Sequence, residues 1–392
     1  MQSVYLIDGC RTPIGSLGGM FKDLSPSQLG VSAAQDAIRR AGVPKEELDE
    51  VIVGNCLMET SEANLARVIS LASGVPFSVP AFTVQRQCSS GMQALVCGAQ
   101  QIQTGENNLV LVGGVEAMSH APYNLSQARY GYRLKGGELA DSVWQVLTDP
   151  VTEMIMGMTA ENLAAKYDIS REDQDEVAYT SHQRAAAAFR EGRWQEEIHP
   201  VEVLGRRGKT DTYSDDEHIR HGVSLGDFSK LKPVFKKDGT VTAGNASGIN
   251  DGAAFAVLAS ESKVKELGLK PLARLVGHAT AGVEPELMGY GPVPATKKAM
   301  QRAGWNLQDL DLIELNEAFA AQYLACERLL ELDRDKTNVN GSGIALGHPI
   351  RCTGVRIIIS LLYEMRRRNL KKGLASLCVG GGMGKSTLWE MT

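Results

Sequence analysis

The chain has 392 residues, of which 43% are hydrophobic and 22% charged, and its net charge is −5. This composition is ordinary for a globular protein, and the slightly acidic balance offers no basic footprint for a nucleic-acid partner. The length exceeds what one core usually supports, which predicts two or more core units. The 41 glycines and only 6% aromatic residues favour an α/β protein with many tight turns.

The first residues, MQSVYLIDGCRTP, lack a positively charged segment followed by an apolar stretch, so no signal peptide is expected. No run of about 18 apolar residues occurs, so no membrane-spanning helix is predicted. The seven cysteines are scattered and form no CxxC pair, which argues against a disulfide framework or a zinc site. A reducing, cytoplasmic setting fits this pattern best, with most cysteines buried and inert.

Two stretches far apart in the chain predict the same local structure. Residues 37–42 (AIRRAG) resemble the end of an amphipathic helix closed by glycine, and a short buried strand is expected at 51–53. Residues 299–304 (AMQRAG) repeat this pattern 262 positions later, and they also precede a short apolar stretch, at 312–315. Each stretch therefore predicts a helix, a loop and a buried strand.

Two further pairs of segments keep nearly the same spacing. The turn that ends at Gly91 corresponds to the turn that ends at Gly354, and LVGG at 111–114 corresponds to CVGG at 378–381. Three matches in the same order indicate an internal duplication. Alternating strands and helices in both halves predict parallel-rich sheets covered by helices, and two such units back to back predict a layered α/β pseudodimer.

Residues from about 120 to 250 interrupt the repeat and are rich in polar and charged side chains. Two helices are predicted here, from Thr159 to Tyr167 and from Ser170 to Arg190, with Ser170 as the cap. We expect an inserted lobe, and insertions of this kind commonly cover a functional site.

The loop QRQCSSG, residues 85–91, leads into an apolar helix predicted from Met92. If the helix begins here, the thiol of Cys88 lies at its N-terminus, where the helix dipole and free N–H groups favour the thiolate. A thiolate is the nucleophile that a thioester intermediate requires. A buried structural cysteine is the alternative interpretation.

The loop GSGIALGHP, residues 341–349, surrounds His348 with glycines that let the backbone approach a ligand closely. The alternative is a loop histidine that makes only structural hydrogen bonds. Under the repeat, this segment and the turn around Cys88 occupy corresponding places, with the second helix predicted from Val355. Pseudo-twofold symmetry would bring both turns to the shared central helices.

Two more loops carry candidate groups. In SLCVGGGMG, residues 376–384, a strand containing Cys378 runs into glycines whose N–H groups could hold an oxyanion. A nucleotide-phosphate loop is the weaker alternative, because neither phosphate-loop spacing is present although Lys385 and Ser386 follow. Asn316, after a buried strand, could orient a water or bind a carbonyl, or could instead cap the next helix.

These segments, in this order, resemble the thiolase family over essentially the full chain. The matching blocks are RQCSSGMQAL, GGVEAMS, MGMTAENLA, GTVTAGNASGINDGAA, LNEAFAAQ, GIALGHP and CVGGGMG. The resemblance implies a duplicated βαβαβαββ fold in α-β-α-β-α layers with an inserted loop domain. The expected limits are 1–119 with 251–270 for the N-terminal half, 120–250 for the loop domain and 271–392 for the C-terminal half.

The resemblance also implies roles for five residues in acyl transfer to and from CoA. Cys88 resembles the acylated nucleophile, and His348 resembles the base that activates both Cys88 and the thiol of CoA. Cys378 resembles the acid/base at the α-carbon of acetyl-CoA in this Claisen condensation. Asn316 resembles the residue that holds a water in one oxyanion site, and the N–H groups of Cys88 and Gly380 would form the other. No metal and no permanently bound cofactor is implied.

CoA and acyl-CoA are expected as substrates, cradled by the loop domain. Ser247 matches the position that contacts the pantetheine arm, and Arg220 resembles a residue at the nucleotide end. Met156, Phe235 and Phe319 resemble apolar walls of the pantetheine tunnel. Each of these five residues could instead be an ordinary structural residue.

The acyl chain length is ambiguous. RQCSSG resembles the degradative 3-ketoacyl-CoA type, whereas the loop at 121–133 and the block GTVTAGNASG resemble short-chain thiolases. We therefore expect the interconversion of two acetyl-CoA with acetoacetyl-CoA and CoA, with a broader 3-ketoacyl-CoA thiolase as the alternative. The loop at 121–133 is where short-chain members assemble, so a homotetramer, a dimer of dimers, is expected.

Three positions depart from the family pattern: Gln85 stands where Asn is common, Ile155 where His is frequent, and Arg351 where Gly follows the HPx segment. Arg351 is compatible with an outward-pointing side chain or with a shifted loop that slows the enzyme. A CoA-binding protein with impaired turnover is therefore a remote alternative. A ketosynthase-like condensing enzyme is disfavoured because the CVGGGMG segment is present.

Overall fold

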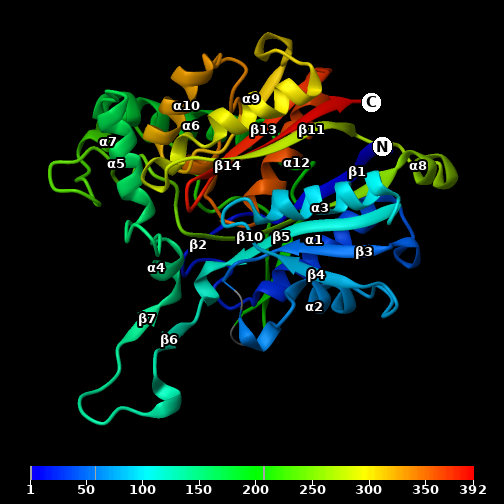
Figure 1. The fold of residues 1–392 in the computed structure, drawn as a ribbon, viewed down its shortest axis with the longest axis horizontal. Helices are drawn as coiled ribbons and strands as arrows, with labels where there is room; N and C mark the ends of the chain where they lie inside the picture. The colour runs from blue at the N-terminus through cyan, green and yellow to red at the C-terminus, as the bar shows by residue number, and fades with distance from the viewer. Residues whose placement is uncertain (1, 58, 206–207) are drawn as a thin grey trace.

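The computed structural model describes residues 2–57, 59–205 and 208–392. Its main sheet contains five strands from the N-terminal half in the order β4-β3-β5-β10-β1 and four from the C-terminal half in the order β12-β13-β14-β11 (Figure 1). The N-terminal strands are β1 (Val4–Arg11), β3 (Glu50–Gly54), β4 (Ala81–Val84), β5 (Leu109–Ala117) and β10 (Asn250–Ser260). The C-terminal strands are β11 (Ala273–Gly282), β12 (Leu312–Leu315), β13 (Lys372–Val379) and β14 (Met383–Met391). The short strand β2 (Gly15–Ser16) pairs with β10.

The strand order confirms the predicted duplication. In each half, parallel pairing joins the early strands, and an antiparallel pair closes the unit. The two halves differ at one place: the counterpart of β4 in the C-terminal half is reduced to an isolated parallel bridge between Ile313 and Thr337. The two halves join where β1 pairs with β11 through only two residue pairs, Tyr5 with Arg274 and Leu6 with Ala273.

Helices cover the sheet in the predicted layers. Helices α1 (Pro26–Ala41) and α2 (Leu65–Ala72) pack on the outer face of the N-terminal half, and α9 (Pro292–Ala303) and α10 (Ala320–Leu330) pack on that of the C-terminal half. Between the halves lie α3 (Ser90–Thr104) and α12 (Thr353–Arg368). Both central helices begin two residues before their predicted starts, Met92 and Val355.

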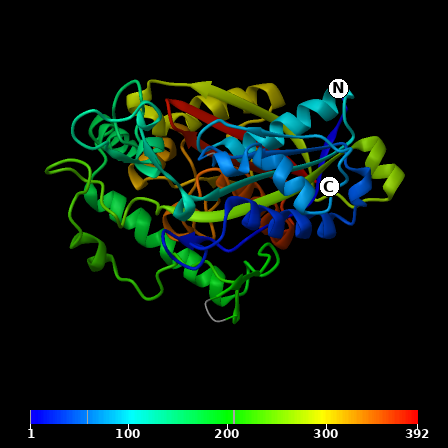
Figure 2. The same ribbon diagram turned by 90° about the horizontal axis from the view of Figure 1, so that it is seen from below.

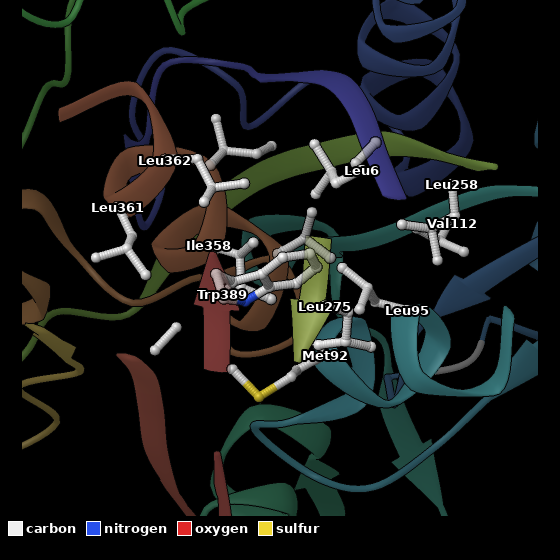
Figure 3. Close-up of a cluster of buried hydrophobic side chains, with 14 of the residues drawn as sticks. Leu6, Met92, Leu95, Val112, Leu258, Leu275, Ile358, Leu361, Leu362 and Trp389 are labelled. Carbon is white, nitrogen blue, oxygen red and sulfur yellow. The ribbon is translucent and has the colours of Figure 1, made fainter. Parts of the chain in front are cut away.

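The alternation of strand side chains explains these layers. On β3, Val51 and Val53 face α1 and α2, whereas Ile52 faces the central helices. Figure 3 shows this central core, in which Trp389 of β14 lies among side chains of both halves. Side chains of a strand point alternately to opposite faces of the sheet. A strand that is buried on both faces therefore has a continuous run of apolar residues in its sequence.

The inserted segment lies between β5 and β10. It contains the hairpin β6 (Tyr123–Leu125) and β7 (Leu139–Asp141), the helices α4 (Ser142–Val146), α5 (Met156–Lys166), α6 (Arg171–Arg190) and α7 (Leu225–Ser229), and the hairpin β8 (Val201–Leu204) and β9 (Thr210–Tyr213). The first hairpin projects from the body in Figure 1, and Figure 2 shows the green helices at the end of the molecule away from both termini. Ser170 caps α6 as predicted, whereas α5 begins at Met156, three residues before the predicted start.

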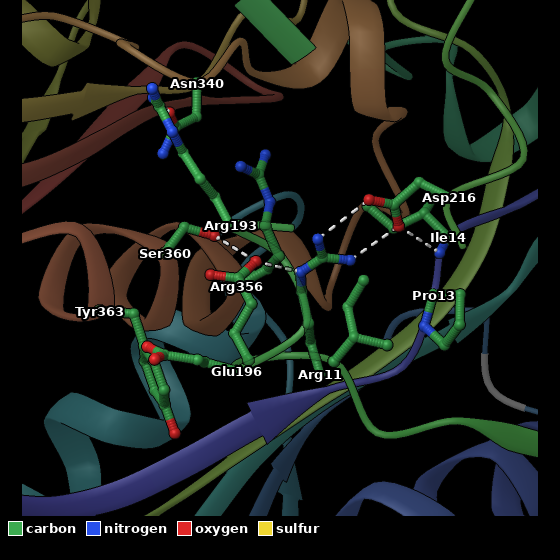
Figure 4. Close-up of polar contacts among 12 residues, drawn as sticks. Arg11, Pro13, Ile14, Arg193, Glu196, Asp216, Asn340, Arg356, Ser360 and Tyr363 are labelled. Carbon is green, nitrogen blue, oxygen red and sulfur yellow. Dashed lines mark hydrogen bonds and ion pairs between the residues drawn. The ribbon is translucent and has the colours of Figure 1, made fainter. Parts of the chain in front are cut away.

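A buried charge network ties this insertion to the two halves. The guanidinium of Arg11, on β1, donates to both carboxylate oxygens of Asp216, over 2.7 and 2.9 Å. Arg11 also pairs with Glu197, which accepts from Ser360 of α12 over 3.1 Å. Figure 4 shows how Arg11 reaches Asp216 across the base of the insertion. A buried arginine with two carboxylate partners fixes the register of these segments.

The remaining helices are short: α8 (Glu261–Leu267) follows β10, and α11 (Gly343–Leu346) lies in the loop before His348. Among the described residues, no helix is both long and apolar enough to cross a membrane.

Candidate active site

The N-termini of the two central helices meet backbone to backbone. The N–H of Gly91 donates to the carbonyl of Arg351 over 3.1 Å. A Cβ atom on Gly91 would lie 2.4 Å from that oxygen, and one on Gly354 would lie 2.5 Å from the backbone nitrogen of Met92. Glycine is required at both positions of the repeat because only its missing side chain permits this approach. The turn that carries Cys88 therefore abuts the turn that follows His348.

Cys88 lies on a strained turn directly before α3. Gln87 has a φ of 42°, which is unusual for a residue with a side chain. The turn is closed by the N–H of Ser89, which donates to Arg86 O, and by that of Ser90, which donates to Gln87 O, each over 3.0 Å. Strain of this kind persists only where the surroundings impose it, as they do at functional sites.

The surroundings of Cys88 act on its thiol in opposite directions. Burial raises the pKa of the Cys88 thiol, whereas the charge of Arg351 and a hydrogen bond from the N–H of Gly380 lower it. The side chain packs beside an apolar cluster that contains Leu57 and Ile350. Ile350 belongs to the His348 loop, so the cluster joins the two candidate loops.

The His348 side chain is positioned as a neutral base. Its Nδ1 lies 2.6 Å from the hydroxyl of Thr353, which itself donates to the carbonyl of Pro349 over 3.0 Å. The hydroxyl therefore accepts from Nδ1–H, which leaves the lone pair on Nε2. This Nε2 is buried and has no hydrogen-bond partner among the described residues. Burial, with Arg356 and Arg351 nearby, lowers the pKa of His348 to about 3.

The side chain of Asn250 holds the backbone of His348 in place. The amide oxygen of Asn250 accepts the N–H of His348 over 2.9 Å. The preceding Gly347 has a φ of 101°, and a Cβ there would lie 2.6 Å from the Asn250 side chain. Asn250 follows the NASG segment, and its part in the site is visible only when the chain is folded.

Asn316 lies in the same buried site. Its Nδ2 is 3.5 Å from His348 Nδ1, and its Oδ1 accepts from Arg356 over 3.3 Å. The alternative role of Asn316 as a helix cap is wrong, because α10 begins at Ala320 with Phe319 at the cap position. The amide therefore lies beside the imidazole of His348 and does not serve as a helix cap.

Cys378 lies at the end of β13 and is 1% exposed. Burial raises the pKa of this thiol well above its ordinary value, and the neighbouring Cys88 raises it further. The pKa of the partly exposed Cys88 thiol is also raised, but Arg351 and Gly380 oppose the rise there and have no counterpart at buried Cys378. This difference suits Cys88 as a nucleophile and Cys378 as a proton donor.

Gly380 lies in the turn from β13 to β14. Its N–H and that of Cys88 both approach the Cys88 sulfur. The turn joins two antiparallel strands, whereas a nucleotide-phosphate loop joins a strand to a helix. The phosphate-loop alternative is therefore wrong, and Lys385 lies within β14.

Four of the five predicted CoA contacts lie near this centre. Met156 and Phe319 pack against the apolar cluster of Cys378, and Phe235 contacts Phe319 edge to face with ring centroids 6.2 Å apart. The N–H of Ser247 donates to Ala318 O over 2.9 Å, which places the NASG segment alongside Phe319.

Arg220 lies farther out. Its side chain is exposed, and its N–H donates to the ring of His182 over 3.3 Å. Burial, then the positive charge of neighbouring groups that include Arg220, lowers the pKa of His182 to about 3.

The outward orientation considered for Arg351 is wrong. Its side chain is 0% exposed, and its guanidinium lies 2.8 Å from the carboxylate of Glu116. Another departure from the family pattern lies nearby: Gln85 Nε2 is 2.7 Å from the sulfur of Cys56, a thiol that also interacts with Arg351. The third departure, Ile155, is the cap residue of α5.

The sequence interpretation missed Glu116, Cys56, Thr353 and Arg356. Glu116, Cys56 and Arg356 act through neighbours from distant segments, and Thr353 acts on His348 from five residues away in a turn whose geometry only the folded chain shows. Within the described ranges, no group of three or more His, Cys, Asp or Glu side chains is arranged to hold a metal ion.

Comparisons with known proteins agree with this geometry. Residues 4–262 match the thiolase N-terminal domain and residues 269–391 match the thiolase C-terminal domain. An acetyl-CoA acetyltransferase of Syntrophomonas wolfei is 46% identical over 99% of both chains. A mitochondrial 3-ketoacyl-CoA thiolase of Homo sapiens is 47% identical over 100% of this chain and 99% of its own.

Solved structures match as closely. The Bacillus anthracis acetyl-CoA acetyltransferase is 53% identical with a TM-score of 0.99, covering 100% of this chain and 99% of its own. The human mitochondrial 3-ketoacyl-CoA thiolase in complex with CoA is 47% identical with a TM-score of 0.97, covering 100% of this chain and 98% of its own.

Proposed function

The chain belongs to the thiolase family and is an acyltransferase of that family, and from this premise we propose that Cys88 carries the acyl group as a thioester. The observation that carries this proposal is the meeting of the Cys88 and His348 turns through the hydrogen bond from Gly91 to Arg351. In the first step, His348 Nε2 takes the proton of Cys88, and the thiolate attacks the keto carbon of a 3-ketoacyl-CoA.

Cleavage of the C–C bond then releases the enolate of acetyl-CoA. The thiol of Cys378 donates its proton to the α-carbon, a role that suits a group kept neutral by burial. The N–H groups of Cys88 and Gly380 stabilise the oxyanion that forms next to the Cys88 sulfur, and a water held by Asn316 beside His348 stabilises the enolate oxygen.

The proton that His348 took from Cys88 then passes through solvent to the Cys378 thiolate, which returns both groups to their starting forms. In the second step, CoA enters and neutral His348 removes the proton of its thiol. The CoA sulfur attacks the thioester, acyl-CoA leaves, and the departing Cys88 thiolate takes that proton from His348. Condensation of two acetyl-CoA follows the same steps in reverse, with Cys378 removing the α-proton. His348 is suited to both exchanges, because its lowered pKa keeps the imidazole neutral and free to accept a proton.

We place CoA between the loop domain and the C-terminal half. Met156, Phe235 and Phe319 would flank the pantetheine arm, since they connect Cys378 with the NASG segment. Ser247 would bind the amide part of that arm, and exposed Arg220 would meet the nucleotide end. The human mitochondrial 3-ketoacyl-CoA thiolase forms a complex with CoA, which supports CoA as a substrate here.

The favoured substrate pair is acetoacetyl-CoA and CoA. The 53% identity to an acetyl-CoA acetyltransferase supports the short chain, and the 47% identity to 3-ketoacyl-CoA thiolases supports the broader alternative. We would measure kcat/KM for thiolysis of acetoacetyl-CoA and of a 3-ketoacyl-CoA with a long chain. Equal or higher kcat/KM on the long substrate would reject the short-chain preference.

A direct test of the nucleophile uses acetyl-CoA labelled in the acetyl group. The wild-type protein should retain an acid-stable label, and Cys88→Ala should retain none. If the wild-type protein binds CoA without any thiolysis, the impaired-turnover alternative attributed to Arg351 would replace the enzyme proposal.

The proposed assembly is a homotetramer, supported by the projecting hairpin. Six apolar side chains are exposed there: Tyr123, Leu125, Tyr130, Tyr132, Leu134 and Leu139. An exposed apolar surface of this kind marks an interaction site. All seven cysteines are free, which supports a reducing compartment such as the cytoplasm.

A further inference from the structure

A polar cavity of about 300 Å³ lies where the nucleophile segment and α3 of the N-terminal half face β11, β14 and α9 of the C-terminal half. It is separate from the residues assigned to acyl transfer. Its lining comprises Arg86, Gln93, Val96, Gln100, His278, Thr280, Lys298, Arg302 and Lys385.

Four of these side chains are cations, and the described residues that line the cavity include no carboxylate. In the part of the chain that the structure describes, none of the four forms an ion pair. Lys385 Nζ instead donates to Gln93 Oε1 over 2.7 Å and lies 3.2 Å from Thr280 Oγ1. Arg86 also donates to Thr280 Oγ1, over 3.0 Å. Two cations therefore share one neutral hydroxyl.

The other two cations extend from α9 to the edge of β11. Lys298 Nζ donates to the carbonyl of Thr280 over 3.4 Å, and Arg302 donates to that of His278 over 3.1 Å. This edge is unpaired because β1 pairs with β11 only at Ala273 and Arg274. The cations are therefore fixed around the cavity by neutral backbone and side-chain acceptors.

Such an arrangement is costly without a counter-charge. Lys385 is only 1% exposed, and burial, together with Arg86, lowers its pKa to about 7. His278 is likewise disfavoured as a cation, because burial, Lys385 and Arg302 lower its pKa to about 4. A buried charge is stable in proteins when it is paired, so an uncompensated group of cations favours an anionic ligand.

We propose that this cavity binds a small oxyanion of the phosphate or sulfate class, held by Lys385 and Arg86 within it and by Arg302 and Lys298 at its rim. A tetrahedral oxyanion matches several convergent N–H donors, and arginine and lysine are the side chains that bind it. The site is independent of the proposed function, since none of its residues belongs to the acyl-transfer machinery.

The bound oxyanion also restrains the nucleophile loop. The carbonyl of Arg86 accepts both the N–H and the hydroxyl of Ser89, each over 3.0 Å, and the N–H of Arg86 donates to the Ser90 hydroxyl over 2.9 Å. Fixing the Arg86 side chain therefore stabilises the turn on which Cys88 lies.

The test is calorimetric titration of the full-length protein with inorganic phosphate and with sulfate at pH 7. Lys385→Met keeps the side-chain volume and removes the charge. Arg302 is exposed, so Arg302→Gln should remove its charge without affecting folding. We expect wild-type binding to weaken about tenfold or more in Lys385→Met and several-fold in Arg302→Gln, as loss of a charge-assisted contact does.

Arg220→Ala serves as the control for phosphate bound at the expected nucleotide end of the CoA site, and it should bind as wild type does. The proposal is overturned if the wild-type protein binds neither anion at about 10 mM, a concentration at which even a millimolar Kd gives a strong signal. It is also overturned if Lys385→Met and Arg302→Gln bind the anions as tightly as wild type, and loss of binding in Arg220→Ala would then assign the anion to the nucleotide end of the CoA site.

Discussion

Arg351 Nη1 lies 2.8 Å from Glu116 Oε2, and both side chains are almost completely buried. Arg351 occupies the position in the second half of the repeat that Cys88 occupies in the first. The pseudo-twofold axis thus places a cation opposite the nucleophile, where the family pattern has a glycine. Glu116 balances this charge in part only, because burial raises its pKa to about 7.

Arg351→Met should make Cys88 less reactive. The charge of Arg351 lowers the pKa of the Cys88 thiol against the effect of burial, so its loss raises that pKa. We expect alkylation by iodoacetamide at pH 7 to slow about tenfold, since the thiolate is the reactive form. The measurement is the alkylation rate as a function of pH.

Two matched variants define the electrostatic origin of this effect. Arg351→Lys keeps the charge and should retain most of the alkylation rate, whereas Glu116→Gln removes the balancing carboxylate and should speed alkylation. Superimposable pH profiles for wild type and Arg351→Met would show that the guanidinium does not act on Cys88.

His348 should remain an effective base in mildly acidic solution. Its pKa is lowered to about 3 by burial and then by Arg356 and Arg351, so the neutral form persists above that pH. We expect kcat/KM for thiolysis to show no inflection near pH 6.5, the ordinary value for histidine. In Arg356→Met the pKa should rise, and an acidic limb should appear in the pH profile.

The pH dependence separates this effect from a loss of packing. Burial raises the pKa of Glu314, the partner of Arg356, to about 8, so Arg356→Met leaves no new buried charge at neutral pH. Arg356→Lys should keep the wild-type profile. An inflection near pH 6.5 in the wild-type enzyme would contradict the neutral, buried His348.

The three candidate side chains follow from the sequence because each lies in a short, distinctive motif. Cys88 lies in RQCSSG, His348 in GIALGHP and Cys378 in CVGGGMG, and the repeat predicts that the first two turns meet. The duplicated fold follows for the same reason, since helix ends and buried strands recur in one order. The limits assigned to the three domains remain predictions.

The sequence could not show what surrounds these side chains. The burial of Arg351 depends on Glu116, from the other half of the molecule, and the orientation of His348 depends on Thr353 and Asn250. The loss of the counterpart of β4 is also invisible, because the segment around Thr337 still passes beside β12 with one bridge. Glu116 and Asn250 act from distant segments, whereas Thr353 acts on His348 from five residues away through a turn that only the folded chain defines.

Cys378→Ala should separate acylation from condensation. Cys378 is proposed to exchange a proton with the α-carbon, and it takes no part in thioester formation. We expect acetyl labelling of Cys88 to persist, while exchange of the α-protons of acetyl-CoA with deuterium slows by a factor of about 100 to 10,000, as loss of a general acid/base does. Loss of labelling with unchanged exchange would assign the two cysteines the opposite way.

The glycine pair at the helix N-termini should be intolerant of alanine. In Gly91→Ala and in Gly354→Ala the new Cβ would meet backbone atoms at 2.4 and 2.5 Å. We expect each to lower the free energy of unfolding by about 1–3 kcal/mol, because neither helix can yield without moving the other. Urea unfolding followed by circular dichroism measures this.

Gly226→Ala is the matched control for that pair. Gly226 lies within α7, and the nearest atom to a Cβ there is 3.8 Å away. Its free energy of unfolding should stay within about 0.5 kcal/mol of wild type, as for surface substitutions generally. An equal loss of stability in all three variants would mean that the close approach of α3 and α12 is not what excludes a side chain.

The projecting hairpin should hold the proposed tetramer together. Tyr130 and Leu134 are 89% and 90% exposed in the single chain. Large apolar side chains that are exposed together mark a surface that another chain covers. Replacing both with serine should convert tetramers into dimers without loss of secondary structure, because neither side chain supports the core. Light scattering after size-exclusion chromatography, referred to the 42.2 kDa chain mass, gives the number of chains.

Leu204→Ser provides the control, since Leu204 is 72% exposed on the other hairpin of the insertion and should leave the mass unchanged. A wild-type mass of two chains, or a double variant that stays tetrameric, would contradict the role given to the hairpin. If the double variant is dimeric, its thiolysis activity shows whether the active site is complete without the tetramer contacts. Retained activity would place the complete site within the chain or its dimer, and lost activity would mean that tetramer contacts complete it.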